Sequence, residues 1–374
     1  MTSTTANKGL EGVVALTSSV SSIVDGVLTY RGYNIDDLAE NTTFEEVVYL
    51  LLNDDLPSQS QLDELNAQLD AARALPQEML SSLAHFPKKA LPMERLRTAV
   101  SLLSMYDSES EDNSEEANRR KSIRLIAQMP TIIAAQERLR RGKQPVAPKP
   151  GMSTAASFLY MMHDADPDPV AVESLDKALI LHADHELNAS TFAARQTVST
   201  LSDIYSAITS AVGTLKGPLH GGANEQVIRT LHEIGQPDNV ESYLEDALAR
   251  KVKIMGFGHR VYKDGDPRAK HLKEMSRRLG EMKGETKWYS MSDQLEHLMV
   301  EKKGLKPNVD FYSASVYHSL EIPVDLYTPI FALSRVSGWV AHCLEQYQNN
   351  RLIRPRADYT GPVDRKTRPI AERG

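Results

Sequence analysis

The stretch at 217–234, GPLHGGANEQVIRTLHEI, contains the pattern that decides the fold: a turn rich in glycine and proline leads into one amphipathic helix. From residue 223 onward, four apolar side chains recur at the spacing of a single helix face: Val227, Ile228, Leu231 and Ile234. Gly235 ends the helix. His220 stands in the turn, where glycines allow a close approach to the backbone at an entropic cost. The stretch therefore predicts a helix with a binding site at its start.

The same helical pattern recurs along most of the chain. Thr43-x-x-Glu46 and Ser58-x-x-Gln61 are capping boxes ahead of apolar runs. Further helices are predicted at 94–105, 119–140, 151–162, 171–187, 191–215, 223–234, 267–279, 311–320 and 326–349. Strand signals are few, and DGVLTYRGY at 25–33 predicts a small hairpin. The expected fold class is mainly all-α, with a small N-terminal β-hairpin.

Length and composition exclude several classes of protein. The 374 residues are enough for about two domains, and 41% hydrophobic with 25% charged residues is typical of a soluble globular chain. No apolar run is long enough to span a bilayer and the start lacks an apolar signal, so we expect a cytoplasmic protein without a membrane partner. The formal charge of −7 argues against a nucleic-acid partner. A single cysteine, Cys343, excludes an intrachain disulfide and a cysteine-based metal cage.

His220 has the setting of a neutral histidine. It lies just before a predicted helix N-terminus, where the partial positive charge opposes protonation of the ring. A neutral histidine that donates a hydrogen bond to a carbonyl can stabilise a developing enolate. The alternative is a histidine that only caps the turn.

A second candidate loop is KIMGFGHRVYKDGDPRAKHL, at 253–272. Gly256 and Gly258 bracket Phe257 ahead of His259, so that a ligand could touch bare backbone there.

The end of the same stretch predicts another helix start. Asp266 is a candidate N-cap and Pro267 a candidate first helical residue. Arg268 then falls in the first helical turn, where a bound anion would offset the repulsion between the cation and the helix end. The alternative is an exposed Arg268 that pairs with Asp264 or Asp266.

The stretch HADHELNAS, at 182–190, places His182 and His185 on one face of a predicted helix. This spacing raises the possibility of zinc, but the HExxH pattern is absent and no cysteine assists. A hydrogen bond from His185 to a bound acid is the favoured role.

Three further residues are candidates for an acid–anion site. Asp310, in PNVDFYSAS, has helix N-cap as its simplest role, although desolvation would make its carboxylate a stronger base. Arg335 interrupts the apolar run PIFALSRVSGWVAHCL, and a buried guanidinium needs an anionic partner, either an acidic side chain or a ligand. Arg354 lies in RLIRPRADY, within a basic tail whose simplest explanation is a solvated terminus.

Taken in chain order, these residues resemble the active-site set of the citrate synthase family. The most specific motifs are LHADHELNASTFAAR, LKGPLHGGANE, IMGFGHRVYKDGDPRA and NVDFYSASVYHSL, and the resemblance covers almost the whole chain. The matching residues are His185, His220, His259, Arg268, Asp310, Arg335 and Arg354.

The resemblance implies a function and a division of roles. Acetyl-CoA would condense with oxaloacetate and water to give citrate and CoA, with Asp310 as the base, His220 as the hydrogen-bond donor to the thioester, and His259 polarising the ketone. Three residues would hold the carboxylates of oxaloacetate: His185, Arg268 and Arg335. Arg354 would come from the partner in a homodimer of the dimeric bacterial type. Acetyl-CoA is a co-substrate, and neither a cofactor nor a metal is expected.

The resemblance also implies a CoA site and a domain organisation. The backbone of Gly256, Phe257 and Gly258 would contact the CoA adenine, and Lys263 a CoA phosphate. A large domain would comprise 1–220 and 322–374, and a small domain 221–321 would carry CoA-binding and catalytic residues. The active site would lie in the cleft between them.

Three alternatives remain open from the sequence. A 2-methylcitrate synthase would use the same residues on propionyl-CoA, with a pocket for one more methylene. A metal-dependent hydrolase would use His182 and His185. The third alternative is a catalytically silent helical binding protein.

Overall fold

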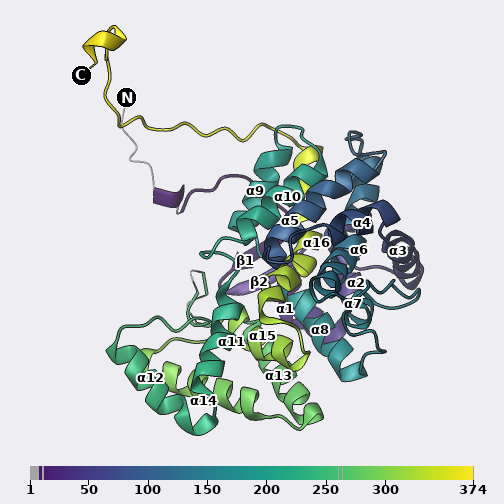
Figure 1. Cartoon of the computed structure of the whole chain (residues 1–374), viewed down its shortest axis with the longest axis vertical. Helices are drawn as coiled ribbons and strands as arrows, with labels where there is room; N and C mark the ends of the chain where they lie inside the picture. Colours follow the sequence, from purple (N-terminus) through teal and green to yellow (C-terminus); the bar gives the residue numbers. More distant parts are fainter. Residues whose placement is uncertain (1–7, 11, 260, 263, 374) are drawn as a thin grey trace.

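The computed structural model of the chain describes residues 8–10, 12–259, 261–262 and 264–373. Within them, helices α1 to α16 make up most of the protein and three short strands form a single sheet (Figure 1). The expected all-α class with a small N-terminal hairpin is confirmed. Among these residues, no helix is both long and apolar enough to cross a membrane. A cytoplasmic location stays a prediction.

The sheet consists of β1 (Ser21–Val24), β2 (Val27–Tyr30) and β3 (Tyr33–Asn34), which pair antiparallel in that order. Val24 is opposite Val27, so Asp25 and Gly26 form the two-residue turn. Their φ angles of 51° and 78° are those of the hairpin turn that Asp-Gly favours. The predicted hairpin at 25–33 therefore contains β2 and the first residue of β3, and β1 adds a strand from just upstream.

The first half of the chain is a series of helices that starts directly after the sheet. Its members are α1 (Ile35–Asn41), α2 (Phe44–Asn53), α3 (Gln59–Ala72), α4 (Gln77–Ala84), α5 (Pro92–Leu103), α6 (Glu115–Arg140), α7 (Thr154–His163) and α8 (Pro169–His182). Both predicted capping boxes are present, at the starts of α2 and α3.

The single helix predicted over 191–215 is wrong. The segment forms two helices, α9 (Ala189–Val198) and α10 (Ile204–Leu215). Leu201 has a φ of 66°, which a helix does not accommodate. Asp203 then starts α10, because its side chain accepts a hydrogen bond from the Ser206 amide over 2.9 Å.

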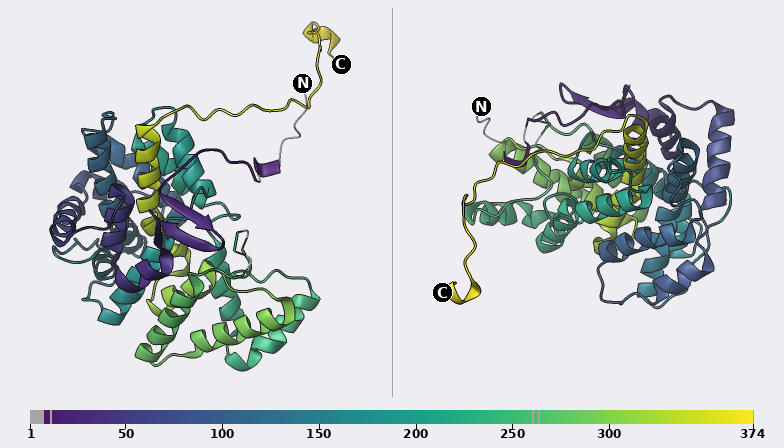
Figure 2. Two further views of the ribbon diagram at one scale, coloured as in Figure 1. Left: turned by 180° about the vertical axis from the view of Figure 1, so that it is seen from behind. Right: turned by 90° about the horizontal axis from the view of Figure 1, so that it is seen from above.

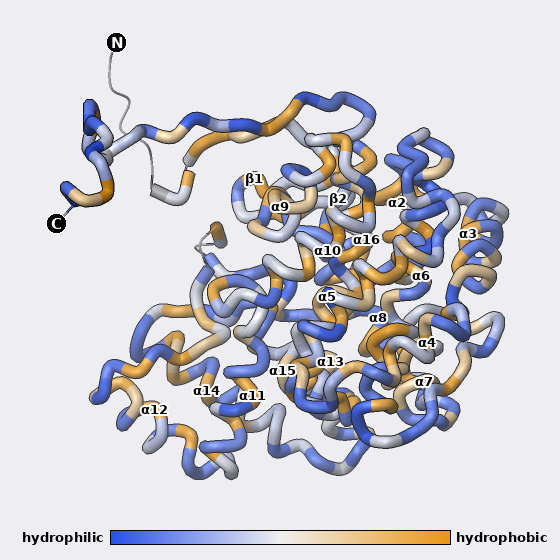
Figure 3. The backbone as a smooth tube through the Cα atoms, turned by 45° about the horizontal axis from the view of Figure 1, so that its top comes forward, coloured by the Kyte–Doolittle hydropathy of each residue, from blue (hydrophilic) through white to orange (hydrophobic). Residues whose placement is uncertain are grey.

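A second group of helices lies together at one end of the molecule (Figure 1 and Figure 2, left). It contains α11 (Ala223–Ile234), α12 (Val240–Ala249), α13 (Ala269–Lys283), α14 (Lys287–Lys303) and α15 (Val309–Ser319). Along α12 and α14, hydrophobic and hydrophilic residues alternate, as in helices with one buried face (Figure 3). The domain boundaries at 221 and 321 stay a prediction.

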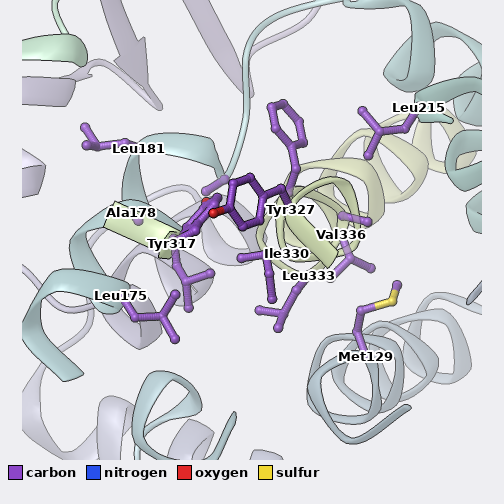
Figure 4. Packing of buried hydrophobic residues seen from close by; sticks show 14 of the residues in the cluster. Met129, Leu175, Ala178, Leu181, Leu215, Tyr317, Tyr327, Ile330, Leu333 and Val336 are labelled. Carbon is purple, nitrogen blue, oxygen red and sulfur yellow. The ribbon is translucent and has the colours of Figure 1, made fainter. Parts of the chain in front are cut away.

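Helix α16 (Tyr327–Gln348) runs through the core and contacts α2, α5, α6, α8, α9, α10 and α11. The Tyr327 ring lies 5.3 Å from the ring of Tyr317 on α15, and Ile330, Leu333 and Val336 continue the buried row along α16 (Figure 4). Each fully buried side chain of this size contributes roughly 1.5–3 kcal/mol relative to exposure. This packing joins α15 and α16, which carry two of the predicted site residues.

Beyond α16 the C-terminal segment runs away from the helical body as an extended chain (Figure 2). It ends in one short 3₁₀ turn, Ile370–Glu372. Arg354 lies in this segment and is exposed to solvent.

Candidate active site

One cavity of about 610 Å³ brings together six of the predicted site residues. They come from α15, α16, the turn after α8, the turn before α11 and the loop between α12 and α13. The six are His185, His220, His259, Arg268, Asp310 and Arg335. Apolar side chains close the rest of the wall, among them Ile23, Leu187, Phe192, Val309 and Phe331.

Arg335, on α16, is a buried cation that has no acidic partner within the described part of the chain. Only 1% of its surface is exposed, and its Nε donates to the His182 carbonyl over 2.7 Å. The guanidinium also lies 4.6 Å from the centre of the Phe331 ring. No carboxylate of the described residues forms an ion pair with it, and burial lowers its pKa to about 10. The alternative of an acidic side-chain partner is therefore wrong, and a bound anion would compensate the charge.

Arg268 is also buried, but its charge is partly compensated. Its Nε and Nη2 contact the two carboxylate oxygens of Asp266 at 2.9 and 2.7 Å. This bidentate pair leaves Nη1 without a protein acceptor among the described residues. The alternative from the sequence was an exposed Arg268 that pairs with Asp264 or Asp266. The pairing with Asp266 is present, but Arg268 is buried, with only 2% of its surface accessible.

The helix after Arg268 begins later than predicted. α13 starts at Ala269, so Asp266 is not its N-cap and Pro267 is not its first residue. The Asp266 carboxylate nevertheless accepts from the amide of Arg268, two residues on, as an N-cap side chain does, and it also accepts from the amide of Val309, both at 3.1 Å. Burial raises the pKa of Asp266 and the neighbouring Arg268 lowers it, with a net decrease. Asp266 is thus an ionised link between Arg268 and the start of α15, a role that the sequence analysis missed.

His220 lies in the turn before α11, half-buried at the cavity. Burial, with a smaller contribution from Arg335, lowers its pKa to about 4. The expected neutral ring has support, and burial is the largest cause of the lowered pKa. The next residue, Gly221, is packed too closely to carry a side chain, because a Cβ there would lie 2.4 Å from the Leu215 carbonyl oxygen. The close approach that this glycine allows is therefore within the chain.

The hydrogen bonds of His220 determine its tautomer. The backbone amide of Ser190 donates to His220 Nε2 over 3.2 Å, and the Ser190 hydroxyl lies 2.8 Å from the same nitrogen. A nitrogen that accepts an N–H carries no proton, so the ring proton is on Nδ1. Trp339 and Asn188 hold the Ser190 hydroxyl in place, at 3.1 and 2.8 Å. The sequence analysis missed Ser190; a serine two residues after the helix-capping Asn188 was its only signal.

His259 has the opposite tautomer. Its Nδ1 accepts from the amides of Val261 and Tyr262 at 3.0 and 3.2 Å, which places the proton on Nε2. Burial, and then Arg268, lower its pKa. His259 therefore has an uncharged N–H donor for a ligand in the cavity.

His185 and His182 have separate environments. α8 ends at His182, so the two rings do not share a helix face as predicted. His182 is fully buried and its Nδ1 contacts the Ala178 carbonyl, whereas His185 lines the cavity with Nε2 3.1 Å from the Tyr262 hydroxyl. Burial and then Arg268 lower the pKa of His185 well below its usual value. Among the described residues, no group of three or more possible ligands is placed to hold a metal ion.

Asp310 lies in the first turn of α15 and lines the cavity. Its predicted simplest role is wrong, because Asn308 is the N-cap and accepts from the Asp310 amide over 3.1 Å. The Asp310 carboxylate is therefore not used for capping. Burial raises its pKa to about 6, although Arg268 opposes the shift. A carboxylate in this environment is a stronger base than one in water.

A row of residues along α16 holds the turn that carries His185. Arg335 contacts the carbonyl of residue 182, and the Gly338 amide donates to the carbonyl of residue 183 over 3.1 Å. His342 Nε2 lies 3.1 Å from the Asp184 carboxylate, which also accepts from Ser21. Gly338 has no room for a side chain, since a Cβ would lie 2.4 Å from Asp184 Oδ1. The sequence analysis missed these positioning contacts because they join segments far apart in the chain.

The remaining predicted residues lie outside the 610 Å³ cavity. Arg354 lines a separate cavity of about 870 Å³, which shares Phe192 with the first. Gly258 lines a third cavity of about 220 Å³, while Gly256 and Phe257 are buried beside it. Lys263 lies outside the described residues.

The chain matches the family described as citrate synthase, C-terminal domain, over residues 9–356. This chain belongs to the citrate synthase family. It is 60% identical to citrate synthase 2 of Bacillus subtilis over 99% of this chain and 100% of that protein. It is 43% identical to 2-methylcitrate synthase 2 of Corynebacterium glutamicum over 100% of this chain and 99% of that protein. A citrate synthase of Thermoplasma acidophilum, solved with carboxymethyl coenzyme A and oxaloacetate, is 37% identical with a TM-score of 0.91, over 98% of this chain and 99% of that one.

The family assignment confirms the resemblance drawn from the motifs and identifies the chain as an enzyme of the citrate synthase family. The fold agrees with it over almost the whole chain. The roles of individual residues rest on the geometry described above.

Proposed function

We propose that this chain condenses acetyl-CoA with oxaloacetate and water and releases citrate and CoA. The observation that carries the proposal is the placement of the Asp310 carboxylate, unused in capping, in the same cavity as His220, whose proton is on Nδ1. Forming an enolate from a thioester requires a base and a neutral N–H donor, and this cavity contains both groups.

Oxaloacetate is a dicarboxylate, and its charge suits the cations of the cavity. Among the residues that the structure describes, Arg335 has no carboxylate partner and Arg268 Nη1 has no protein acceptor, so both can meet an anionic group. His185 adds a neutral polar contact. We assign these three residues to the binding of the oxaloacetate carboxylates.

The first chemical step is removal of a proton from the acetyl methyl group by Asp310. The electron pair moves onto the thioester oxygen, to which His220 Nδ1 donates a hydrogen bond. One pre-aimed donor to a developing oxyanion contributes about 3–4 kcal/mol to the lowering of the barrier.

The second step joins the two substrates. The enol carbon attacks the ketone of oxaloacetate, and His259 Nε2 gives its proton to the ketone oxygen. Holding both substrates in reacting geometry supplies up to about 7–11 kcal/mol. Water then hydrolyses citryl-CoA to citrate and CoA. The scheme assigns no step to a metal or another cofactor.

We assign the CoA contacts to the backbone of Gly256, Phe257 and Gly258 and to Lys263. Arg354 is assigned to the active site of a second copy in a homodimer. Its exposure on the extended C-terminal segment supports this role, because a residue that enters the active site of a second subunit must project away from its own subunit.

The test is the release of CoA thiol by the purified protein supplied with oxaloacetate and either acetyl-CoA or propionyl-CoA. We expect a higher kcat/KM with acetyl-CoA. Absence of thiol release with both thioesters, from folded protein that still binds oxaloacetate, would refute the proposed reaction.

A second candidate is 2-methylcitrate synthesis from propionyl-CoA, supported by the 43% identity to a 2-methylcitrate synthase. One methylene in an apolar pocket changes binding by only about 1–3 kcal/mol, so activity with both thioesters is expected. A higher kcat/KM with propionyl-CoA would favour this candidate and keep the same mechanism.

A further inference from the structure

The loop assigned to CoA is hydrogen-bonded to the segment that leads into α15. The Gly258 amide donates to the Lys306 carbonyl over 2.9 Å, and the Asn308 amide donates to the Gly256 carbonyl over 2.8 Å. Between them, Phe257 and Pro307 form an isolated antiparallel bridge. These contacts join the two segments in one short ladder.

The side chain of Asn308 uses both ends of its amide group. Its Nδ2 donates to the Gly258 carbonyl over 2.9 Å, and its Oδ1 accepts from the Asp310 amide over 3.1 Å. One side chain thus joins the loop that precedes His259 to the residue assigned as the base.

The start of α15 depends on the same residue. The Phe311 amide donates to the Asn308 carbonyl over 3.1 Å, and the Phe311 ring lies 4.4 Å from the Phe257 ring. Gly256 is held against this pair, since a Cβ there would lie 2.9 Å from Phe311. A displacement of the loop would therefore displace the first turn of α15, where Asp310 stands.

We propose that Asn308 is a positioning residue that couples contact of CoA with the Gly256–Phe257–Gly258 backbone to the placement of the Asp310 carboxylate. This inference rests on the proposed function. The donor end of Asn308 holds the loop in the shape that meets CoA, and the acceptor end holds Asp310 over the substrate.

Two substitutions separate the two ends. In Asn308→Ser, the hydroxyl can still cap α15, but it is too short to reach the Gly258 carbonyl. Asn308→Ala removes both contacts. Asn34→Ser is the matched control, because Asn34 caps α1 by accepting from the Asp36 amide over 2.8 Å and lies outside the cavities around the site.

The measurements are KM for each substrate, kcat, and direct calorimetric binding of CoA and of oxaloacetate to the same proteins. We expect Asn308→Ser to raise KM for acetyl-CoA and to weaken CoA binding by about three- to tenfold, the effect of one lost hydrogen bond. Oxaloacetate binding should match that of Asn34→Ser. Asn308→Ala should in addition lower kcat, since Asp310 loses its amide contact.

Unchanged acetyl-CoA KM and CoA binding in Asn308→Ser would overturn the inference. So would an equal weakening of both substrates accompanied by loss of thermal stability, which is the behaviour of a purely structural residue. The wild-type protein separates failure of the Asn308 inference from failure of the proposed function. If the proposed function is wrong, the wild-type protein itself releases no CoA thiol.

Discussion

His220 and His259 present opposite ring nitrogens to one cavity. His220 accepts the Ser190 amide at Nε2 and keeps its proton on Nδ1, whereas His259 accepts two backbone amides at Nδ1 and keeps its proton on Nε2. Both rings are neutral donors, because their pKa values are lowered mainly by burial. Each tautomer is set by backbone groups, so it does not depend on another titrating side chain.

This difference predicts opposite outcomes for two amide substitutions. The Asn amide nitrogen lies where Nδ1 of histidine does, and the Gln amide nitrogen lies where Nε2 does. We expect His220→Asn to keep more turnover than His220→Gln. The kcat of His220→Gln should fall by about 10²–10³-fold, as it does when an enzyme loses one hydrogen-bond donor to an oxyanion. At His259 the order should reverse for oxaloacetate affinity. Equal effects of Asn and Gln at both positions would contradict the assigned tautomers.

Asp310→Asn should separate binding from chemistry. The amide keeps the shape of the side chain but cannot accept the methyl proton, so we expect most turnover to be lost. Oxaloacetate affinity, measured by calorimetry, should stay near that of the unchanged protein. Turnover close to normal would remove Asp310 from the role of base.

Activity should fall on the acid side as Asp310 becomes protonated. Burial raises its pKa to about 6, and only the ionised form, present above that pH, can take up a proton. The lowered pKa of His220, about 4, keeps that ring neutral over the same range. We expect kcat/KM for acetyl-CoA, measured from about pH 5 to about pH 8, to reach half its maximum near pH 6 and a plateau above about pH 7. A flat profile would show that the base titrates elsewhere.

Gly338→Ala should disturb the His185 turn from the side of α16. The new Cβ would meet the Ala183 carbonyl and Asp184 at 2.4 Å, so backbone must move, and we expect a loss of about 1–3 kcal/mol in the free energy of unfolding. Gly213→Ala is the control, since a Cβ in α10 meets only Arg97 at 3.5 Å. Urea unfolding and oxaloacetate KM measure the two effects. Equal stability of the two variants would contradict the close contact.

Arg354→Ala should reveal whether the active site spans two chains. Removing one partner of a desolvated charge pair costs about 2–5 kcal/mol, so the variant should be nearly inactive. Mixed with Asp310→Asn protein under conditions that exchange subunits, it should regain activity, because each mixed dimer would hold one intact site. No recovery, with exchange verified by mass spectrometry, would place Arg354 in its own subunit's chemistry or outside the site.

Local patterns predicted the individual helices better than their junctions. Both capping boxes and the face of α11 follow from side chains within a few residues of one another. The break between α9 and α10 was missed, because the apolar pattern continues across Leu201 while the backbone does not. α13 starts at Ala269, two residues later than predicted, and the sequence did not show that the Asp266 carboxylate also binds the Arg268 side chain and the distant Val309 amide.

By itself the sequence determined the all-α class and the family, and it predicted the candidate acid, base and cation residues, since helix signals are local and the motifs are contiguous. Only the tertiary structure decided which ring nitrogen His220 and His259 each offer, and that Asn308 rather than Asp310 caps α15. It also decided that Arg268 pairs with a carboxylate whereas Arg335 is buried with none among the described residues. These properties depend on contacts between segments distant in the chain, such as Asp184 with Ser21 and His342. Burial and hydrogen-bond direction arise only when those segments pack together.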